Sequence, residues 1–226
     1  MIARAPNSRA DMETLVNRYW SPVYAYLRRR GCERHEAEDL TQEFLLKKVL
    51  GRDLLERADE ARGRFRSFLK RALEHFVVDE HRRVHGRDGA RARMFVPDDP
   101  QALSAAEPGA GDDPARAFDR QWAATVLDSA LERVGAACRA DGMQRQWTAF
   151  EARVLRPVLH GCAPTPIEEL VDQLAARDRQ EIYSMLQTIK RKVNSEVREL
   201  IAETVEQPED VRAELDELQT FLAPVQ

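Results

Sequence analysis

Apolar residues recur every three or four positions along most of the chain, which is the period of an amphipathic helix. The strict alternation of apolar and polar residues that marks strands is scarce. The pattern predicts a first helix that is capped by Ser8 and stops at Gly31 after a basic last turn. Further helices are expected over about 34–50, 63–83, 118–139, 144–159, 167–176 and from Asp178 onward. The fold class is therefore predicted to be all-α.

Residues 96–114 interrupt this periodicity. The segment is rich in Pro, Gly, Ala and Asp and follows neither a helical nor a strand period. Such a composition is typical of a flexible linker. We therefore expect two helical domains, one on each side of it.

Charge is distributed unevenly along the chain. Residues 1–95 hold 21 Lys and Arg against 15 Asp and Glu, whereas residues 203–226 hold one Arg against seven acids. The basic footprint that a nucleic acid requires is thus expected in the first part of the chain, although the net charge is −4.

Several protein classes are disfavoured by the sequence. No apolar run approaches the roughly 20 residues that span a bilayer, and the N-terminus lacks the apolar stretch of a signal peptide. Cys32, Cys138 and Cys162 are too far apart to indicate a disulfide framework, which fits a reducing compartment. His160 and Cys162 lack the second pair of ligands that a metal site needs. We expect a cytoplasmic protein with no membrane insertion and no bound metal.

The helix predicted over 63–83 has two distinct faces. Phenylalanines and leucines form one stripe, which we interpret as core. On the opposite face Arg64, Arg71, His75 and Arg82 fall nearly in line, with Arg66 and Lys70 to one side. A basic row of this length suits a phosphate backbone, and from spacing alone a merely solvated face fits equally well.

The helix predicted over 34–50 carries a different kind of surface. Its buried stripe leaves a far face with acids and leucines: Asp39, Gln42, Glu43, Leu46 and Leu50. Leucines within an acidic face favour docking of a basic protein partner. A helix that is buried on two sides is the alternative. Acid–base chemistry is disfavoured because no nucleophile, metal-ligand cluster or phosphate loop accompanies these carboxylates.

The second half has the proportions of a helix-turn-helix. A short helix over 167–176 is followed by a turn and a long helix, whose start Asp178 and Glu181 mark with a capping-box pattern. The apolar stripe of the long helix leaves polar and basic side chains outside: Arg179, Gln180, Tyr183, Ser184, Gln187, Thr188, Lys190 and Arg191. Any helical hairpin can show this pattern. The acidic segment after residue 205 has the period of an amphipathic helix that packs on the second domain or on a partner.

Three segments in order resemble region two of bacterial sigma factors: W-S-P-V-Y-A-Y-L-R-R-R-G-C (20–32), A-E-D-L-T-Q-E-F (37–44) and G-R-F-R-S-F-L (63–69). They look most like an extracytoplasmic-function (ECF) subgroup that is common in planctomycetes. Two later segments resemble region four of that subgroup: F-D-R-Q-W-A (118–123) and I-K-R-K-V-N-S-E-V-R-E-L-I-A-E-T-V (189–205).

This resemblance implies a domain plan and a function. Region two would span 8–95, the linker 96–114, region four 115–205 and an acidic tail 206–226. The chain would be a non-enzymatic sigma factor, with no cofactor and no small-molecule substrate, that directs core RNA polymerase to promoter DNA. An anti-sigma protein is expected to inhibit it, by covering the 39–50 face or by wedging between the domains.

The resemblance also implies residue roles. The polymerase would contact Asp39, Leu40, Gln42, Glu43 and Phe44, to which the exposed face adds Leu46. The promoter element near the start site would meet the next helix through Arg64, Arg66, Lys70, Arg71, His75, Arg82 and Arg83. The upstream element would meet the eight outward residues of the predicted helix-turn-helix, from Arg179 to Arg191. No residue is expected to be catalytic.

The chain departs from the family in its second half. Family members carry Leu-Gly in the helix-turn-helix turn, where we align Ala175-Ala176, and their recognition helices are often more basic. These departures motivate an alternative function, a sigma-like adaptor that acts through protein contacts with weak or no promoter reading. A hydrolase has no support beyond scattered acids.

Overall fold

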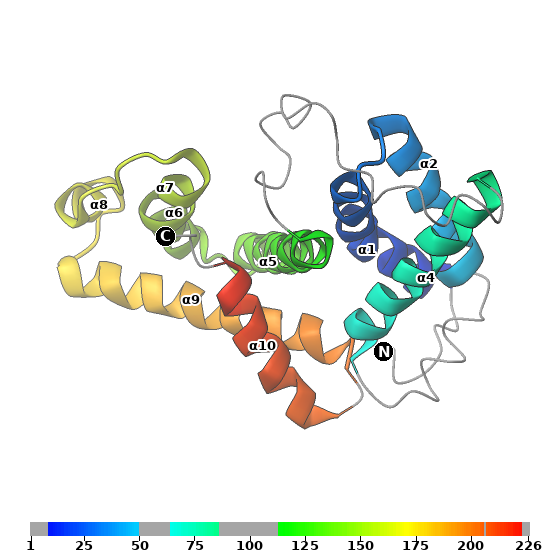
Figure 1. Cartoon of the computed structure of the whole chain (residues 1–226). Helices are drawn as coiled ribbons and strands as arrows, with labels where there is room; N and C mark the ends of the chain where they lie inside the picture. The colour runs from blue at the N-terminus through cyan, green and yellow to red at the C-terminus, as the bar shows by residue number, and fades with distance from the viewer. Residues whose placement is uncertain (1–8, 50–63, 86–112, 206, 223–226) are drawn as a thin grey trace. The chain divides into compact units, whose positions relative to one another are not determined.

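The computed structural model describes residues 9–49, 64–85, 113–205 and 207–222, and every regular element in these ranges is a helix (Figure 1). This confirms the all-α prediction. None of the described helices is both long and apolar enough to cross a membrane. Ser8, Leu50, Gly63 and most of the predicted linker lie outside the described residues, and Pro114 at the end of that linker begins a helix.

The chain forms two compact units. One comprises residues 1–126 and 201–226, and the other comprises residues 127–200. The helices α5 (Pro114–Ala140) and α9 (Arg179–Ala202) each contribute residues to both units. The unit boundaries therefore fall at different residues from the functional segments expected from the sequence, which remain a prediction.

The first unit contains α1 (Arg9–Arg29), α2 (Arg34–Phe44), the π-helical turn η1 (Leu45–Val49), α4 (Phe65–His85) and α10 (Pro208–Leu222). Gly31 follows α1 with a φ of 91°, a left-handed conformation that glycine adopts without steric cost. Glu33 and Glu36 form a capping box at the start of α2. The helix predicted over 34–50 is thus an α-helix that continues as a π-helical turn.

Aromatic rings fill the core of this unit. Tyr19 packs edge-on against Phe65, with ring centroids 5.3 Å apart, and Phe44 packs against Phe76 at 5.3 Å. Phe118 and Trp122 of α5 are buried beside them. Burial of such a side chain contributes about 1.5–3 kcal/mol. The apolar stripes predicted for the first three helices therefore face the core of this unit.

The C-terminal segment also belongs to this unit. Leu218 and Glu214 of α10 are buried, and the backbone N–H of Phe65 donates to the carbonyl of Thr204, with N and O 3.4 Å apart. Arg18 pairs with Glu203 at 2.7 Å. The predicted amphipathic helix is present, and it packs within the first unit. Two of its carboxylates reach Arg66 of α4 and Arg64, which directly precedes α4.

The second unit is built from α6 (Gln144–Phe150), the π-helical turn η4 (Glu151–Leu155), α7 (Arg156–His160), α8 (Ile167–Gln173) and parts of α5 and α9. Its buried residues include Cys138, Phe150, Leu170, Ile182 and Ile189. The helix predicted over 144–159 is thus interrupted by a π-helical turn. The one predicted over 167–176 is shorter, because α8 ends before the turn.

Candidate nucleic-acid interface

The face of α2 and η1 carries most of the predicted polymerase-contacting residues. Asp39 and Gln42 are exposed, and Leu46 keeps half of its surface (50%) open to solvent. Leu40 and Glu43 are partly exposed, and Glu43 forms an ion pair with Lys47. These side chains make an acidic surface with an apolar centre, which we call the α2 face.

Phe44 differs from the other five predicted contacts. Its side chain is fully buried, and its ring packs against Phe76 of α4. The ring lies on the apolar stripe of α2 with Ala37 and Thr41, so it supports the α2 face from below. In this structure Phe44 presents no surface to a partner.

The seven basic residues predicted on the third helix divide into two groups. Four of them, toward the C-terminal end of α4, are exposed: Arg71, His75, Arg82 and Arg83. Acids share this surface, since Arg82 lies 4.0 Å from Asp79 and Arg83 lies 2.7 Å from Glu80. Glu74 is exposed there as well, so the exposed part of α4 is a surface of mixed charge.

An open cavity of about 460 Å³ adjoins this surface. His75, Glu74 and Val78 of α4 line one side, and the rest of the lining comes from Tyr26, Arg30 and residues 113–115. The guanidinium of Arg30 lies 5.8 Å from the Tyr26 ring centroid, within cation–π range. Burial raises the pKa of Tyr26 in spite of Arg30, so its hydroxyl is neutral at physiological pH.

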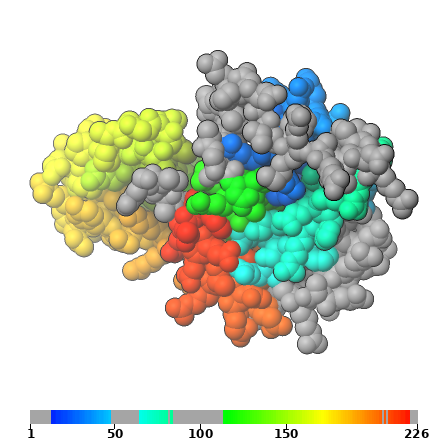
Figure 2. All heavy atoms as spheres, viewed as in Figure 1, coloured from blue at the N-terminus to red at the C-terminus, as the bar shows by residue number. Residues whose placement is uncertain are grey.

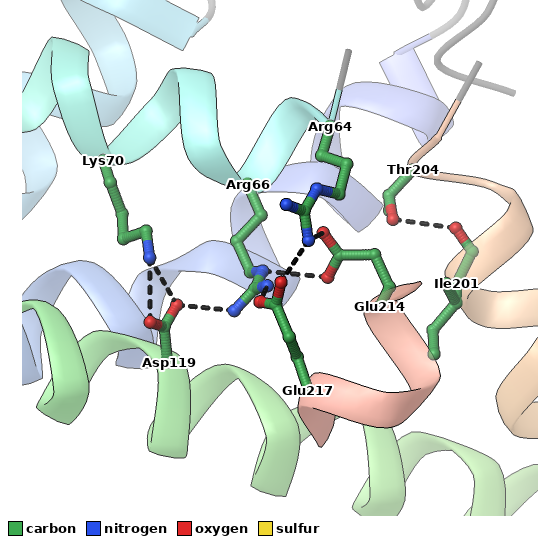
Figure 3. A network of polar contacts seen from close by, with 8 residues as sticks. All are labelled: Arg64, Arg66, Lys70, Asp119, Ile201, Thr204, Glu214 and Glu217. Carbon is green, nitrogen blue, oxygen red and sulfur yellow. Dashed lines mark hydrogen bonds and ion pairs between the residues drawn. The ribbon is translucent and has the colours of Figure 1, made fainter. Parts of the chain in front are cut away.

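The other three basic residues, Arg64, Arg66 and Lys70, are held in a network of ion pairs (Figure 3). Arg66 Nη1 lies 2.6 Å from Asp119 Oδ1 of α5, and Arg66 Nε lies 2.9 Å from Glu214 Oε2 of α10. Glu217 of α10 accepts hydrogen bonds from both Arg64 and Arg66. Lys70 Nζ lies 2.8 Å from Asp119 Oδ2. We call these six residues the α4–α10 cluster.

Arg66 is the centre of this cluster and does not reach the surface. Its side chain is 2% exposed, and its guanidinium lies 4.5 Å from the Trp122 ring centroid and 5.6 Å from that of Phe221. The sequence places Arg66 among the DNA-contacting residues, but here the side chain lies between two rings and three carboxylates. Arg66 therefore presents no surface to a phosphate in this structure.

The cluster shifts the ionisation of its members in opposite directions. Burial raises the pKa of Glu214, and the nearby Arg66 and Arg64 offset this only in part. Burial acts in the same direction on Glu217, but hydrogen bonds from Arg64 and Arg66 outweigh it and lower the pKa of that carboxyl. Burial lowers the pKa of Arg66, and the surrounding carboxylates outweigh it and raise that pKa. Arg66 thus stays cationic with its charge compensated.

Sequence reasoning missed the acidic members of the cluster, Asp119, Glu214 and Glu217. They lie far from α4 in the chain, so no local spacing connects them with Arg66. The one available signal was the charge contrast between the basic first part of the chain and its acidic end. This contrast indicates that the two parts of the chain attract one another, but it does not identify which residues pair.

The predicted DNA-facing residues of the second unit lie on the outer face of α9. Seven of the eight are exposed, and Thr188 is half-buried with its hydroxyl donating to the carbonyl of Ser184 at 2.8 Å. Tyr183 keeps 49% of its surface open. Arg179 pairs with Glu168 of α8, Nη2 to Oε1, at 2.6 Å. The structure therefore brings these residues onto one helix face.

The turn before α9 is held by specific hydrogen bonds. The backbone N–H of Glu181 donates to Asp178 Oδ1 at 2.8 Å, which is the cap that the sequence predicts. The Glu181 carboxylate accepts the backbone N–H of Arg177, and this bond, with the Arg177 side chain, lowers the pKa of Glu181. Arg145 of α6 donates to the carbonyls of Leu174 and Ala175. The turn is therefore tied to α9, which follows it, and to α6.

Ala175 has a left-handed backbone conformation in this turn. Its φ is 48°, and it is the single non-glycine residue with positive φ among those that the structure describes. The turn therefore places a left-handed residue directly after Leu174, at a position that favours glycine.

Comparison with known families gave one match. Residues 15–87 match the family model described as Sigma-70 region 2. The matched segment contains most of α1, all of α2 and η1, and α4, and it therefore includes the α2 face and the basic residues of α4. No curated protein and no solved structure matched the chain.

Proposed function

We propose that this chain, which carries a Sigma-70 region 2 domain, is a sigma factor that binds core RNA polymerase and directs promoter-specific initiation. The match over residues 15–87 carries the proposal, because it includes the exposed α2 face and the exposed basic residues of α4. The resemblance in the second half supports placement in the ECF group and a region four over 115–205. Such a protein works in the cytoplasm, with the polymerase.

The α2 face is the proposed polymerase contact. Asp39 and Gln42 offer oxygens to a basic partner, and the half-open Leu46 supplies apolar area that association removes from water. Interfaces combine an apolar centre with a polar rim, and complementary charge directs the encounter. The same face is available to an anti-sigma protein, which would then exclude the polymerase.

The exposed basic residues are the proposed promoter contacts. Arg71, His75, Arg82 and Arg83 would bind the backbone and bases near the start site. The outer face of α9 would read the upstream element in the major groove, the position that a helix-turn-helix gives its second helix. Arg, Gln, Ser and Thr on that face supply the donors and acceptors that base edges require.

Core polymerase binding tests the first part of the proposal. Purified chain is mixed with bacterial core polymerase, and the affinity is measured by fluorescence anisotropy for the wild type and for Asp39→Lys and Leu46→Asp. Both substitutions are expected to weaken binding at least about tenfold, since each disrupts the α2 face. Asp172→Lys on α8 removes an exposed acid from the other unit and serves as the matched control.

Transcription from a randomised promoter library tests the second part. The reconstituted holoenzyme should start transcripts from a defined subset of sequences that core polymerase alone ignores. Core binding without any sequence preference would instead favour the adaptor function. That alternative is motivated by the burial of Arg66 and by the acids that share the surface of α4.

A further inference from the structure

The helix α10 covers the start of α4. Figure 2 shows the atoms of α10 lying directly against those of α4, and the ion pairs of Arg64 and Arg66 join the two helices. Arg66 is 2% exposed and Glu214 is 1% exposed. Phe221 of α10 lies over one side of the Arg66 guanidinium. No ligand can therefore touch Arg66 while α10 stays in place.

This contact removes positive charge from the surface that faces DNA in the proposed function. Within the α4–α10 cluster, three cations face three carboxylates, and two of the carboxylates belong to α10. With α10 docked the cluster is formally neutral. With α10 displaced, Arg64, Arg66 and Lys70 would keep Asp119 alone, which leaves two positive charges for phosphates.

We propose that α10 is an internal competitor of DNA, whose Glu214 and Glu217 occupy the positions that phosphate groups take at Arg64 and Arg66 when the chain binds a promoter. Docked α10 and DNA-bound Arg64 and Arg66 exclude one another. The idea rests on the proposed function, because it requires α4 to face DNA. It adds that α10 sets how much of that surface is open.

The geometry shows why this contact is suited to displacement. The outer pair is partly solvated, since the side chains of Arg64 and Glu217 are 30% and 38% exposed, so salt and competing anions reach it. The inner pair, Arg66 and Glu214, is buried, and burial of two ions carries a desolvation cost that their attraction only partly returns. Departure of α10 returns both ions to water or to a phosphate partner.

DNA binding by the full-length chain tests the competition. The probe is a labelled mixed-sequence oligonucleotide of about 30 nucleotides, single-stranded and as a duplex, titrated at low salt. Glu217→Gln removes one masking charge, and Asp216→Asn removes the same charge from the exposed side of α10. We expect Glu217→Gln to bind about fivefold more tightly than the wild type, with Asp216→Asn close to the wild type. Equal affinities for the two variants would overturn the proposal.

Hydrogen exchange of the wild type gives a second test that needs no substitution. Amides of α10 should exchange faster when the probe saturates the chain than when the chain is free, because bound DNA holds α10 away. Unchanged protection at saturation contradicts the proposal, as does a Glu217→Gln chain that binds no DNA. Core polymerase binding through the α2 face is measured separately, so failure of the masking idea and failure of the sigma-factor function give different results.

Discussion

The Nε atom of Arg66 and the Oε2 atom of Glu214 lie 2.9 Å apart, and both side chains are almost completely buried. Two ions in such a place are stable only together, since each compensates the other in a medium that solvates neither well. Asp119 and Glu217 complete the coordination of the guanidinium. The stability of the first unit should therefore depend on this arrangement.

Replacement of Arg66 by Met is expected to lower the free energy of unfolding by about 3–5 kcal/mol, because it leaves buried carboxylates without their cation. Adding Glu214→Leu to that variant should recover part of the loss, since an apolar pair needs no compensation. Urea denaturation of the wild type, both single variants and the double variant measures the coupling. A stable Arg66→Met protein would show that the pair contributes little.

Acid should weaken the contact between α10 and α4 through Glu217. The pKa of this carboxyl is lowered in the folded chain, so its contribution is fully present above the ordinary value of 4.5. It is lost as the pH falls from there through the folded value. The stability difference between the wild type and Glu217→Gln should therefore shrink below about pH 4.5, which urea midpoints at a series of pH values would measure.

Glu214 should act in the opposite direction in the same experiment. Its pKa is raised by burial, so the folded chain takes up a proton above the ordinary value of 4.5 and gains stability as the pH falls toward it. Glu214→Gln should abolish that gain and keep the loss due to Glu217. Superimposable pH profiles for the two variants would contradict these assignments.

The turn before α9 should be strained at Ala175. At a φ of 48° the Cβ of alanine lies too close to the following carbonyl oxygen, which costs roughly 1–2 kcal/mol. Glycine has no Cβ and avoids this cost. After the larger unfolded-state entropy of glycine is allowed for, Ala175→Gly should stabilise the chain by about 0.5–1 kcal/mol. Ala176→Gly is the control, and it should be neutral or destabilising. Thermal unfolding of both variants distinguishes the two positions.

Arg71 should contribute to DNA affinity through charge. It is exposed on α4, outside the α4–α10 cluster. Arg71→Ala is expected to weaken binding of the holoenzyme to promoter DNA and to reduce the slope of log affinity against log salt by about 1. Arg212→Ala, which removes an exposed arginine from α10, should leave that slope unchanged. Equal slopes for the wild type and Arg71→Ala would remove Arg71 from the proposed interface.

Local information in the sequence was sufficient for the helices and for the direction of their apolar faces. Leu15, Tyr19 and Val23 recur at helical spacing and are buried together, and the cap at Asp178 forms as its side-chain chemistry predicts. Such features depend on residues three or four positions apart. Neighbours of this kind interact in any helix, whatever the rest of the chain does.

Long-range choices were not available from the sequence. Spacing placed Arg66 on a basic face, but its burial depends on Asp119 and Glu217, which approach only when α5 and α10 pack against α4. The exposed and the buried arginines of α4 look alike in sequence. Their roles are separated by tertiary packing, and so the predicted interface was larger than the exposed one.

The first unit is closed by a segment that is synthesised well after its first helices. The N–H of Phe65 pairs with Thr204, and two of the three carboxylates around Arg66 come from α10. A ribosome must therefore synthesise α10, far downstream of α4, before this unit can complete its core. Domains usually fold from the N-terminus as they emerge. Until α10 has been synthesised, Arg66 of the nascent chain lacks two of its three carboxylate partners, so a stop codon upstream of α10 would disturb the packing of α4.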